Sequence, residues 1–348
     1  MARVARLVTA RIAIFDGAGR PFRLEERPLP AQLDPGAVLV QISATTICGS
    51  DLHTHAGRRA EPAPSVLGHE AVGRVVATGP GRDAWLHRRI TWASTDSCGA
   101  CAACREWDLP QKCASVFKYG HALVSESQGL TGTYATHLVL RRGTHLVEIP
   151  PEIPDVVAAS ANCSLATMVH AVEQRPTSCR VALVIGAGLL GLHGCALLRA
   201  SGVPRVLVAE SDLRRRARIA DFGGVAVDPA DLHPQSVDVV VDATGDPVAI
   251  GASLGLLRPG GMCTLVGSVH AQAPLPVTGE VLVRGCVTMR GVHNYAARHL
   301  DAAVAFLRGS SLPWPSIVGP PLPLDRIDEA FALAATRQWA RVAVRTSS

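Results

Sequence analysis

A glycine-rich turn in the middle of the chain constrains its fold more than any other feature. Residues 186–191, with the sequence Gly-Ala-Gly-Leu-Leu-Gly, follow directly on the apolar run 181–185 and open a helical pattern. The same strand and helix rhythm returns around the apolar runs 206–209 and 237–242. Alternating strands and helices predict a parallel, doubly wound sheet, which we place at residues 164–298.

The three glycines of this turn have separate physical roles. Gly186 can make the tight turn, Gly188 lets the backbone approach a pyrophosphate, and Gly191 lets the helix pack on the strand. Leu189 and Leu190 stand where the helix begins, and the free amides there would hold the phosphate. The turn therefore predicts a dinucleotide site.

Glu210 favours NAD as that dinucleotide. It ends the next strand, 24 residues after Gly186, where an acid can grip the adenosine ribose. Its carboxylate would accept hydrogen bonds from a free 2′-hydroxyl and repel a 2′-phosphate. The arginines at 214–216 weaken this preference, although such a run is usually a solvated helix face. We expect Arg215 to reach the adenosine ribose.

The segments on either side of this sheet have a different pattern. Residues 1–163 alternate short β-type runs with Gly, Pro and Asp, which predicts a mostly β domain. The tail, residues 299–348, holds helix patterns at 301–307 and 327–336 with a proline-rich link between them. It is too short for a third domain, so we expect it to complete the first.

Four cysteines fall within one stretch of the first domain. Their spacing is Cys98-x2-Cys101-x2-Cys104-x8-Cys113, with Gly99 available to bend the loop. Four thiolates at such spacing can hold zinc in a closed tetrahedron. A closed shell leaves no position for water or substrate, so this zinc is predicted to be structural.

A second group of metal-binding residues lies earlier in the chain. Cys48 begins the segment Cys-Gly-Ser-Asp-Leu-His, and His69 stands between Gly68 and Glu70. A catalytic zinc needs three protein ligands and one open position. Cys48 and His69 would supply two ligands of suitable softness.

These motifs together resemble the zinc-dependent medium-chain alcohol dehydrogenases. Residues 68–79, Gly-His-Glu-Ala-Val-Gly-Arg-Val-Val-Ala-Thr-Gly, the Cys-Gly-Ser-Asp segment before them, the four-cysteine loop and the later glycine turn occur in the family's order over essentially the whole chain. The resemblance implies a GroES-like catalytic domain (1–163, completed by 299–348), a Rossmann domain (164–298), and two zinc ions per chain. The four-cysteine loop has one residue more than usual before its last cysteine, which a loop can absorb.

The resemblance also implies a third ligand for the catalytic zinc. Cys163, in the segment Asn-Cys-Ser-Leu-Ala-Thr, matches that position beside Cys48 and His69. Some relatives place a glutamate there or use the position that matches Glu70. Asp51 matches a carboxylate that orients His69 and raises its basicity.

Further roles follow from the same resemblance. Glu70 would sit beside the metal and exchange with the bound water, and Thr167 would contact the nicotinamide. The zinc would polarise the alcohol oxygen while NAD accepts the hydride. Ser50 and His53 match a relay that takes the released proton to solvent.

One subgroup of the family suggests a substrate. Residues 109–113, 117–121, 162–163 and 291–295 resemble dehydrogenases associated with phosphonate catabolism. A hydroxyalkylphosphonate would need cations at the pocket. The candidates, each of which can equally be solvated surface, are Lys118, Arg58, Arg59 and His293.

Three alternatives stay open at this point. A polyol or threonine-type secondary alcohol dehydrogenase shares every motif and differs only in its pocket. A non-catalytic protein that keeps NAD and zinc for sensing is possible because fold does not fix function. A zinc-free quinone reductase would share the Rossmann half, but that branch lacks the zinc cysteines present here. Among the other histidines, His55 and His121 can line the pocket or simply pack.

Composition limits the remaining classes. The net charge is +5 and the arginines are scattered, which argues against a nucleic-acid partner. The most apolar window, residues 181–200, contains His193, Arg199 and four glycines, so we expect no membrane span. Arg3, Arg6 and Arg11 interrupt any signal peptide. We expect a cytoplasmic enzyme, and the resemblance implies a homodimer or homotetramer.

Overall fold

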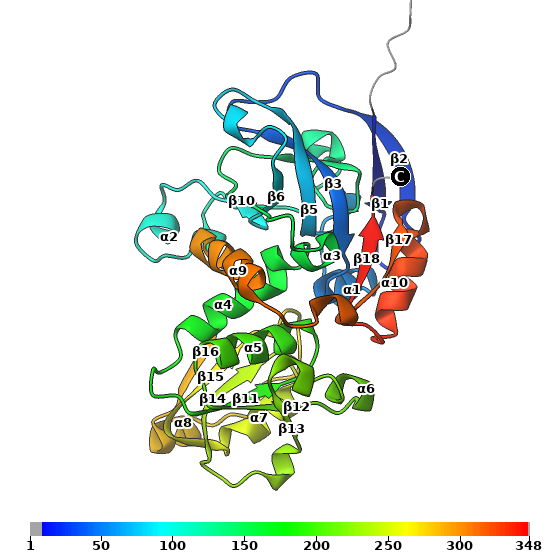
Figure 1. The fold of residues 1–348 in the computed structure, drawn as a ribbon. Coiled ribbons are helices and arrows are strands. Elements are labelled where there is room, and N and C mark those ends of the chain that lie inside the picture. Colours follow the sequence, from blue (N-terminus) through cyan, green and yellow to red (C-terminus); the bar gives the residue numbers. More distant parts are fainter. Residues whose placement is uncertain (1–8, 347–348) are drawn as a thin grey trace, which may run out of the picture. The chain divides into compact units, whose positions relative to one another are not determined.

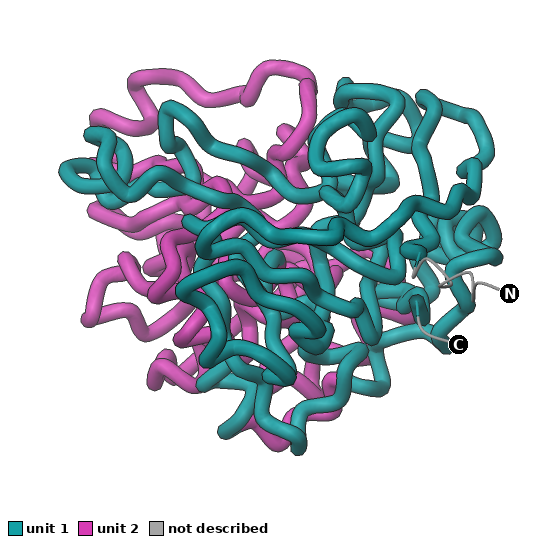
Figure 2. The backbone as a smooth tube through the Cα atoms, turned by 90° about the horizontal axis from the view of Figure 1, so that it is seen from above, with its two compact units in different colours: residues 1–163, 304–309, 315–348 teal, residues 164–303, 310–314 magenta. Residues whose placement is uncertain are grey.

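The computed structural model describes residues 9–346, so Arg3 and Arg6 lie outside the described residues. The chain divides into two compact units, each with its own sheet (Figures 1 and 2). The first unit comprises residues 1–163, 304–309 and 315–348, and the second comprises residues 164–303 and 310–314.

The first unit is built on a sheet of seven strands in the order β10-β6-β5-β3-β18-β17, with β9 paired to β3. Strands β3 (Val38–Thr46) and β5 (Glu70–Thr78) are antiparallel, and Thr46 lies opposite Glu70. The residues that follow β3 and those that precede β5 therefore meet at the same end of the sheet. Two smaller sheets, β2-β1-β4 and β7-β8, complete this unit.

The C-terminal tail returns to this sheet. Strand β18 (Arg341–Arg345) pairs antiparallel with β3, and β17 (Val318–Pro323) pairs parallel with β18. The end of the predicted proline-rich link is therefore a strand. It lies at the outer edge of the sheet, where prolines are tolerated because fewer backbone N–H groups are needed for pairing.

Three buried clusters form the core of this unit, and two of them carry its large aromatic side chains. One gathers large side chains from the sheet, including Trp92 and Tyr119. The other is aromatic and joins Phe22, Tyr134 and Phe331, the last from α10 (Ile327–Ala335). The other strands of this unit are β1 (Thr9–Phe15), β2 (Arg23–Pro28), β4 (Ser65–Val66), β6 (Arg89–Trp92), β7 (Thr95–Asp96), β8 (Phe117–Lys118), β9 (His137–Leu140) and β10 (Leu146–Glu148).

The second unit confirms the predicted doubly wound parallel sheet. Six parallel strands follow the order β13-β12-β11-β14-β15-β16, so the direction of winding reverses between β11 and β14. Nucleotides bind at the carboxyl ends of such strands, beside this reversal. The strands are β11 (Val181–Ile185), β12 (Arg205–Ala209), β13 (Val225–Val227), β14 (Val237–Asp242), β15 (Leu257–Leu265) and β16 (Thr288–Gly291).

The helices of the second unit differ from the expected pattern in one place. After β12 the chain forms only the short helix α6 (Leu213–Arg216) and the turn η5 (Ala220–Phe222), which Gly223 ends with a φ of +80°. The other helices of the chain are α1 (Gly49–His55), α2 (Ala102–Arg105), α3 (Asp155–Ala158), α4 (Ala166–Glu173), α5 (Leu189–Ala200), α7 (Pro247–Leu254), α8 (Gly279–Gly285) and α9 (Ala297–Gly309).

Short 3-10 turns account for most of the remaining regular structure. Among the described residues, no helix combines the length and the apolar character that a bilayer crossing requires. The turns are η1 (Asp83–Trp85), η2 (Pro110–Lys112), η3 (Glu126–Gly129), η6 (Pro229–Asp231), η7 (Trp314–Ile317) and η8 (Leu324–Arg326), and η4 (Ala161–Leu165) is a π-helical turn.

Candidate active site

The first unit brings four potential metal ligands together. One ligand atom from each of Cys48, His69, Glu70 and Cys163 lies within 4.8 Å of the others. Cys48 precedes α1, His69 directly precedes β5, and Cys163 lies in the π-helical turn η4. π-Helical turns are rare and often occur at functional sites.

The geometry of these side chains fits zinc. The Sγ atoms of Cys48 and Cys163 are 4.0 Å apart. Two thiolates on one tetrahedral zinc, each about 2.3 Å from it, would stand about 3.8 Å apart. With His69 as the third donor, the set provides soft ligands and leaves one position for a substrate or water.

Asp51 fixes the orientation of His69. Its Oδ2 accepts hydrogen bonds from the Cys48 amide (3.1 Å) and the Tyr134 hydroxyl (2.7 Å). Its Oδ1 lies 3.5 Å from His69 Nδ1, which is long for a hydrogen bond but close for a charge. Nδ1 thus faces Asp51, and Nε2 is the nitrogen left for a metal. Burial lowers the pKa of His69, but the Asp51 carboxylate outweighs this and raises it well above its usual value.

Glu70 is fully buried and held by a residue that the sequence analysis missed. Arg341, at the start of β18, donates from Nε to Oε2 and from Nη2 to Oε1, each at 2.8 Å. Thr46 donates a further hydrogen bond to Oε2 at 2.6 Å. Both carboxylate oxygens therefore accept hydrogen bonds, and Oε1, which accepts only from Arg341, has a lone pair left. The exchange of Glu70 with a metal-bound water stays a prediction.

Arg341 also acts on the ligand Cys48. Its Nη2 lies 3.6 Å from Cys48 Sγ. The hydrogen bond with the Cys163 thiol, followed by the charge of Arg341, lowers the pKa of Cys48 well below its usual value. Its partnership with Cys48 raises the pKa of Cys163. The pair thus favours the thiolate at Cys48 and the thiol at Cys163, and a metal held by both would require both to be thiolates.

The predicted proton relay lies on α1. His53 is partly exposed, and its Nδ1 accepts a hydrogen bond from Arg58 Nε at 2.9 Å. A neutral His53 therefore carries its proton on Nε2. Ser50 is partly buried one turn earlier on the same helix. The relay through these two residues stays a prediction, and Arg58 is engaged with His53.

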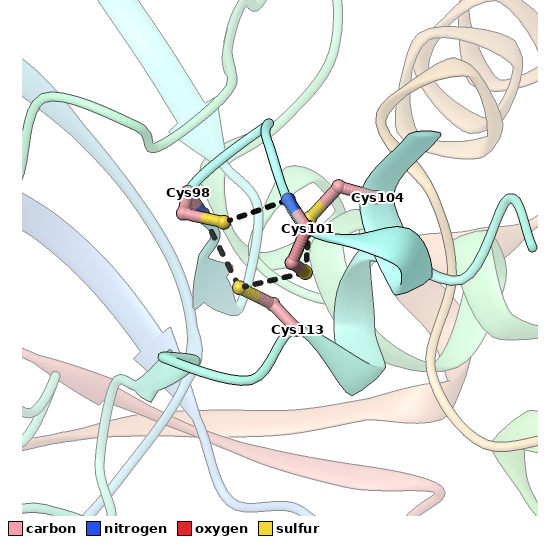
Figure 3. Close-up of side chains that lie close together, drawn as sticks. All are labelled: Cys98, Cys101, Cys104 and Cys113. Atoms are coloured by element: carbon pink, nitrogen blue, oxygen red, sulfur yellow. Dashed lines mark hydrogen bonds between the residues drawn. The ribbon is translucent and has the colours of Figure 1, made fainter. Parts of the chain in front are cut away.

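The four-cysteine loop forms a second cluster (Figure 3). Cys101 Sγ lies 3.6 Å from Cys104 Sγ and 3.8 Å from Cys113 Sγ. The ligand atoms of all four, including Cys98, are within 4.8 Å of one another. The turn η2 lies in the last interval and ends at Lys112, directly before Cys113.

Backbone amides prepare this loop for a cation. The amides of Ala100 and Cys101 point at Cys98 Sγ, and that of Cys98 points at Cys113 Sγ. Such donors lower the pKa of Cys98, Cys101 and Cys113. Burial and the neighbouring Cys101 raise the pKa of Cys104 to about 12. The arrangement fits a closed zinc site that is completed when the metal displaces the Cys104 proton.

The glycine turn of the second unit has the geometry expected of a dinucleotide site. Gly186 has a φ of +97°, which other residues rarely adopt. A Cβ at Gly191 would stand 1.8 Å from the Gly186 carbonyl oxygen, so only glycine fits where helix meets strand. A Cβ at Gly188 would meet nothing within 4 Å, which leaves room above the start of α5. Leu189 and Leu190 form the first turn of that helix.

Glu210 faces the same turn. Its Oε2 accepts a hydrogen bond from the Ala187 amide at 2.8 Å, and its Oε1 accepts from Arg215 Nη2 at 2.9 Å. Arg215 thus binds the acid rather than lying on an open helix face. Thr167 is buried in α4 of the same unit. The contacts of these residues with a cofactor stay predictions.

A third histidine and acid cluster, in the second unit, does not fit a metal. His170, Glu173 and His299 offer ligand atoms within 4.8 Å of one another. His299 Nδ1 accepts from the Ala296 amide at 2.9 Å, so its Nε2 carries the proton and donates to Glu173 at 2.8 Å. No lone pair of a neutral His299 is then left for a cation. Elsewhere, His55 stacks on Phe22 in the aromatic core, so it packs.

Two family descriptions match the chain. Residues 34–151 match the alcohol dehydrogenase GroES-like domain, and residues 190–308 match the zinc-binding dehydrogenase family. A probable zinc-binding alcohol dehydrogenase of Mycobacterium tuberculosis is 30% identical over 94% of this chain and 86% of its own length.

Further relatives agree with these matches. An L-threonine 3-dehydrogenase of Thermococcus kodakarensis is 29% identical over 76% of this chain and 77% of its own. The crystal structure of an alcohol dehydrogenase from Thermotoga maritima is 27% identical, covers 97% of this chain and 99% of its own, and superposes with a TM-score of 0.89. The chain therefore belongs to the zinc-dependent alcohol dehydrogenases and is an NAD-dependent oxidoreductase of that family.

Proposed function

We propose that the chain oxidises an alcohol, or reduces the matching carbonyl compound, at a zinc held by Cys48, His69 and Cys163. The observation that carries this proposal is the convergence of these three soft donors within 4.8 Å in a buried site with a fourth position open. Zinc bound there supplies Lewis-acid polarisation of the substrate oxygen, and NAD supplies the hydride acceptor.

The surrounding residues have distinct tasks in this proposal. Asp51, steadied by Tyr134, keeps His69 turned so that Nε2 faces the metal. Arg341 neutralises the buried Glu70 and adds positive charge beside Cys48. Because all these groups are buried, their charges act with little screening by water.

Ser50 and His53 would transfer the released proton to solvent. Ser50 would take the proton of the alcohol through its hydroxyl, and His53 would pass it to solvent from its partly exposed place on α1. Arg58 fixes the neutral tautomer of His53, because its Nε donates to Nδ1. His53→Ala should slow turnover mainly at lower pH, where solvent bases are scarce.

For the cofactor, we propose a preference for NAD over NADP. The carboxylate of Glu210 stands at the end of β12, against the glycine turn, where a 2′-phosphate would be repelled. Arg215 is committed to Glu210, which supports the preference. Glu210→Ala should free Arg215. The kcat/KM with NAD, divided by the kcat/KM with NADP, should then fall about tenfold or more. An unchanged ratio would contradict this assignment.

The decisive experiment measures absorbance at 340 nm with zinc-loaded protein, NAD and a panel of primary alcohols, polyols, threonine and hydroxyalkylphosphonates. Cys48→Ala and His69→Ala should abolish turnover and leave NAD binding intact, as isothermal titration would show. Unchanged turnover in the Cys48 variant would overturn the zinc assignment. NAD binding with no turnover of any substrate would favour a binding-only role.

A threonine-type secondary alcohol dehydrogenase is the second candidate. Several of the relatives are L-threonine 3-dehydrogenases, at 25–29% identity. A kcat/KM for threonine well above that for neutral secondary alcohols would select this candidate. A hydroxyalkylphosphonate, suggested by residues 109–113 and 117–121, is the third substrate class that the same panel tests.

We also propose a cytoplasmic homo-oligomer. All ten cysteines are free thiols, as expected in a reducing compartment. Strand β16 is the outer strand of the parallel sheet, and the neighbouring helix α8 exposes Val281 and Val283. Pairing of two such edges would form a dimer or build a tetramer. Light scattering coupled to size exclusion tests this, and a monomer at micromolar concentration would contradict it.

A further inference from the structure

A group of charged side chains lies beside the candidate catalytic site and is not needed to hold the metal. It consists of Arg59 and Glu61, which follow α1, together with Lys118 from β8 and His121 just after it. The ring of His121 is 5.5 Å from that of His69, centroid to centroid. All these residues belong to the first unit, as do the metal ligands, and the His121 amide donates to the Lys118 carbonyl oxygen at 3.3 Å.

His121 is neutral and acts as an acceptor. Its Nδ1 lies 2.9 Å from the carbonyl oxygen of Tyr119, and because a carbonyl can only accept, Nδ1 carries the proton. Its Nε2 therefore accepts from Arg59 Nη2 at 3.2 Å. His121 thus orients Arg59 without adding charge.

Arg59 is held on one side and keeps donors on the other. Its Nη2 also contacts Glu61 Oε1 at 2.7 Å, and only a fifth of the Arg59 side chain is exposed. Within residues 9–346, Nε and Nη1 of Arg59 have no hydrogen-bond partner. The guanidinium is therefore fixed in place with donor groups still available.

Lys118 is a half-buried cation whose near acidic neighbour, Glu61, raises its pKa through charge alone and makes no direct ion pair with it in the described part of the chain. Its side chain makes neither a hydrogen bond nor an ion pair with any residue in the described part of the chain. Burial, together with the charges of Arg59 and Lys112, lowers its pKa. The chain has only two lysines against 32 arginines. Removing a cation from water without pairing it is unfavourable, which a bound anion would offset.

The charges of this cluster do not cancel. Arg59 and Lys118 contribute two positive charges, Glu61 contributes one negative charge, and His121 contributes none. Glu61 is close enough to Lys118, Asp51 and His69 to sense the charge of each, so the cluster stands next to the metal ligands, with Asp51 on the side of His69.

We propose that Lys118 and Arg59 form a subsite for an oxyanion, a carboxylate or a phosphonate, that the substrate carries. The hydroxyl of the same substrate would react at the metal that Cys48, His69 and Cys163 would hold. This inference rests on the proposed function and deepens it, since it names the substrate class as short anionic alcohols. Lys118 supplies a point charge, and Arg59, fixed by Glu61 and His121, supplies directed donors.

The test compares matched alcohols with the zinc-loaded enzyme and saturating NAD. The substrates are 1-propanol, 3-hydroxypropionate and 2-hydroxyethylphosphonate, so that the two anions are distinguished from each other and from a neutral alcohol. Lys118→Met should lower kcat/KM for the preferred anion about 10- to 100-fold through KM, with kcat and the neutral alcohol within about twofold. Lys118→Arg should restore at least part of the loss.

Lys112→Met is the matched control, because it removes the chain's other lysine at an exposed position. Because the charge of Lys112 acts on Lys118 only from a distance, this variant should change the ratio of anionic to neutral kcat/KM by less than about twofold. Equal loss for neutral and anionic alcohols in Lys118→Met, or a wild-type enzyme with no anionic preference, would overturn the subsite and leave the dehydrogenase assignment standing.

A binding measurement separates the two proposals. Methylphosphonate and acetate are each titrated into the zinc-loaded protein with NADH in a calorimeter. One of the two anions should bind, and its affinity should be about tenfold or more weaker in Lys118→Met. Such binding without turnover of any alcohol would support the subsite and contradict the proposed function. Absence of anion binding to the wild-type protein would overturn the subsite.

Discussion

The two cysteine clusters of the first unit are built in opposite ways. The four cysteines of the loop lie within the sixteen residues from Cys98 to Cys113, and Cys98 is exposed. The other cluster joins Cys48, His69 and Cys163 from three separate elements, and its charged neighbours are buried. One site is made by a local loop, whereas the other needs the whole sheet.

This difference separates the tasks of the two sites. The loop offers four thiol ligands and backbone amides that stabilise thiolates, so we propose a closed shell that holds the lobe together. The other site has one ligand fewer once Arg341 has bound both oxygens of Glu70. An open position and an oriented histidine are what chemistry at a metal requires.

The largest expected effect breaks the catalytic site. Cys48→Ala removes a ligand from a set of three, so kcat should fall by more than about 10³-fold, which corresponds to about 4 kcal/mol of lost transition-state stabilisation. Turnover at 340 nm and zinc content per chain would measure it. The loop zinc and NAD affinity should both persist, and a variant that kept two zinc ions per chain would contradict the ligand assignment.

The next effect concerns the buried ion pair. Arg341→Met leaves Glu70 buried and unpaired, so the free energy of unfolding should fall by about 3–5 kcal/mol. Urea denaturation measures this loss. The double variant Arg341→Met with Glu70→Gln should recover much of the stability because the uncompensated charge is gone. If Arg341→Met were as stable as the wild type, the ion pair would not contribute to the free energy of unfolding.

A smaller effect should follow at the residue behind His69. Asp51→Asn should weaken zinc binding at the catalytic site about 10- to 100-fold, since the ligand loses its orienting carboxylate. Competition with a chromophoric chelator would measure the affinity. Tyr134→Phe removes only the hydrogen bond to Asp51 and should have a weaker effect in the same direction. No loss of zinc affinity in Asp51→Asn, which keeps the shape of the side chain, would mean that the carboxylate does not act on His69.

The smallest effect on turnover is expected at the loop. Cys104→Ala should reduce zinc from two ions per chain to one, with kcat at low temperature within about threefold of the wild type. Thermal inactivation should be at least about tenfold faster, or about 1.4 kcal/mol in the barrier. Comparison with Cys48→Ala sharpens the contrast between the sites. If Cys104→Ala lost as much kcat as Cys48→Ala, the two sites would not differ in their tasks.

Much of this organisation could be predicted because it is carried by residues close together in the chain. The glycine turn and the strand before it predict the parallel sheet, since each glycine has a backbone conformation or a close approach that only glycine allows. The spacing of the loop cysteines predicts a metal site for the same local reason. After β12 the pattern predicts one helix over residues 214–222, but the structure has the one-turn helix α6, which ends at Arg216, and the separate turn η5.

The sequence by itself determined the ligand types, the nucleotide turn and the class of reaction, since these depend on residue chemistry at short spacing. Only the tertiary structure decided which charges meet in the interior. Arg341 reaches Glu70 across 271 residues of chain because β18 pairs with β3, and Lys118 comes near Arg59 because β8 returns towards the segment after α1. The periodic spacing of side chains along one helix or strand does not connect residues so far apart in the sequence. Burial makes these contacts decisive, because a charge removed from water needs a partner, and only the fold selects which one.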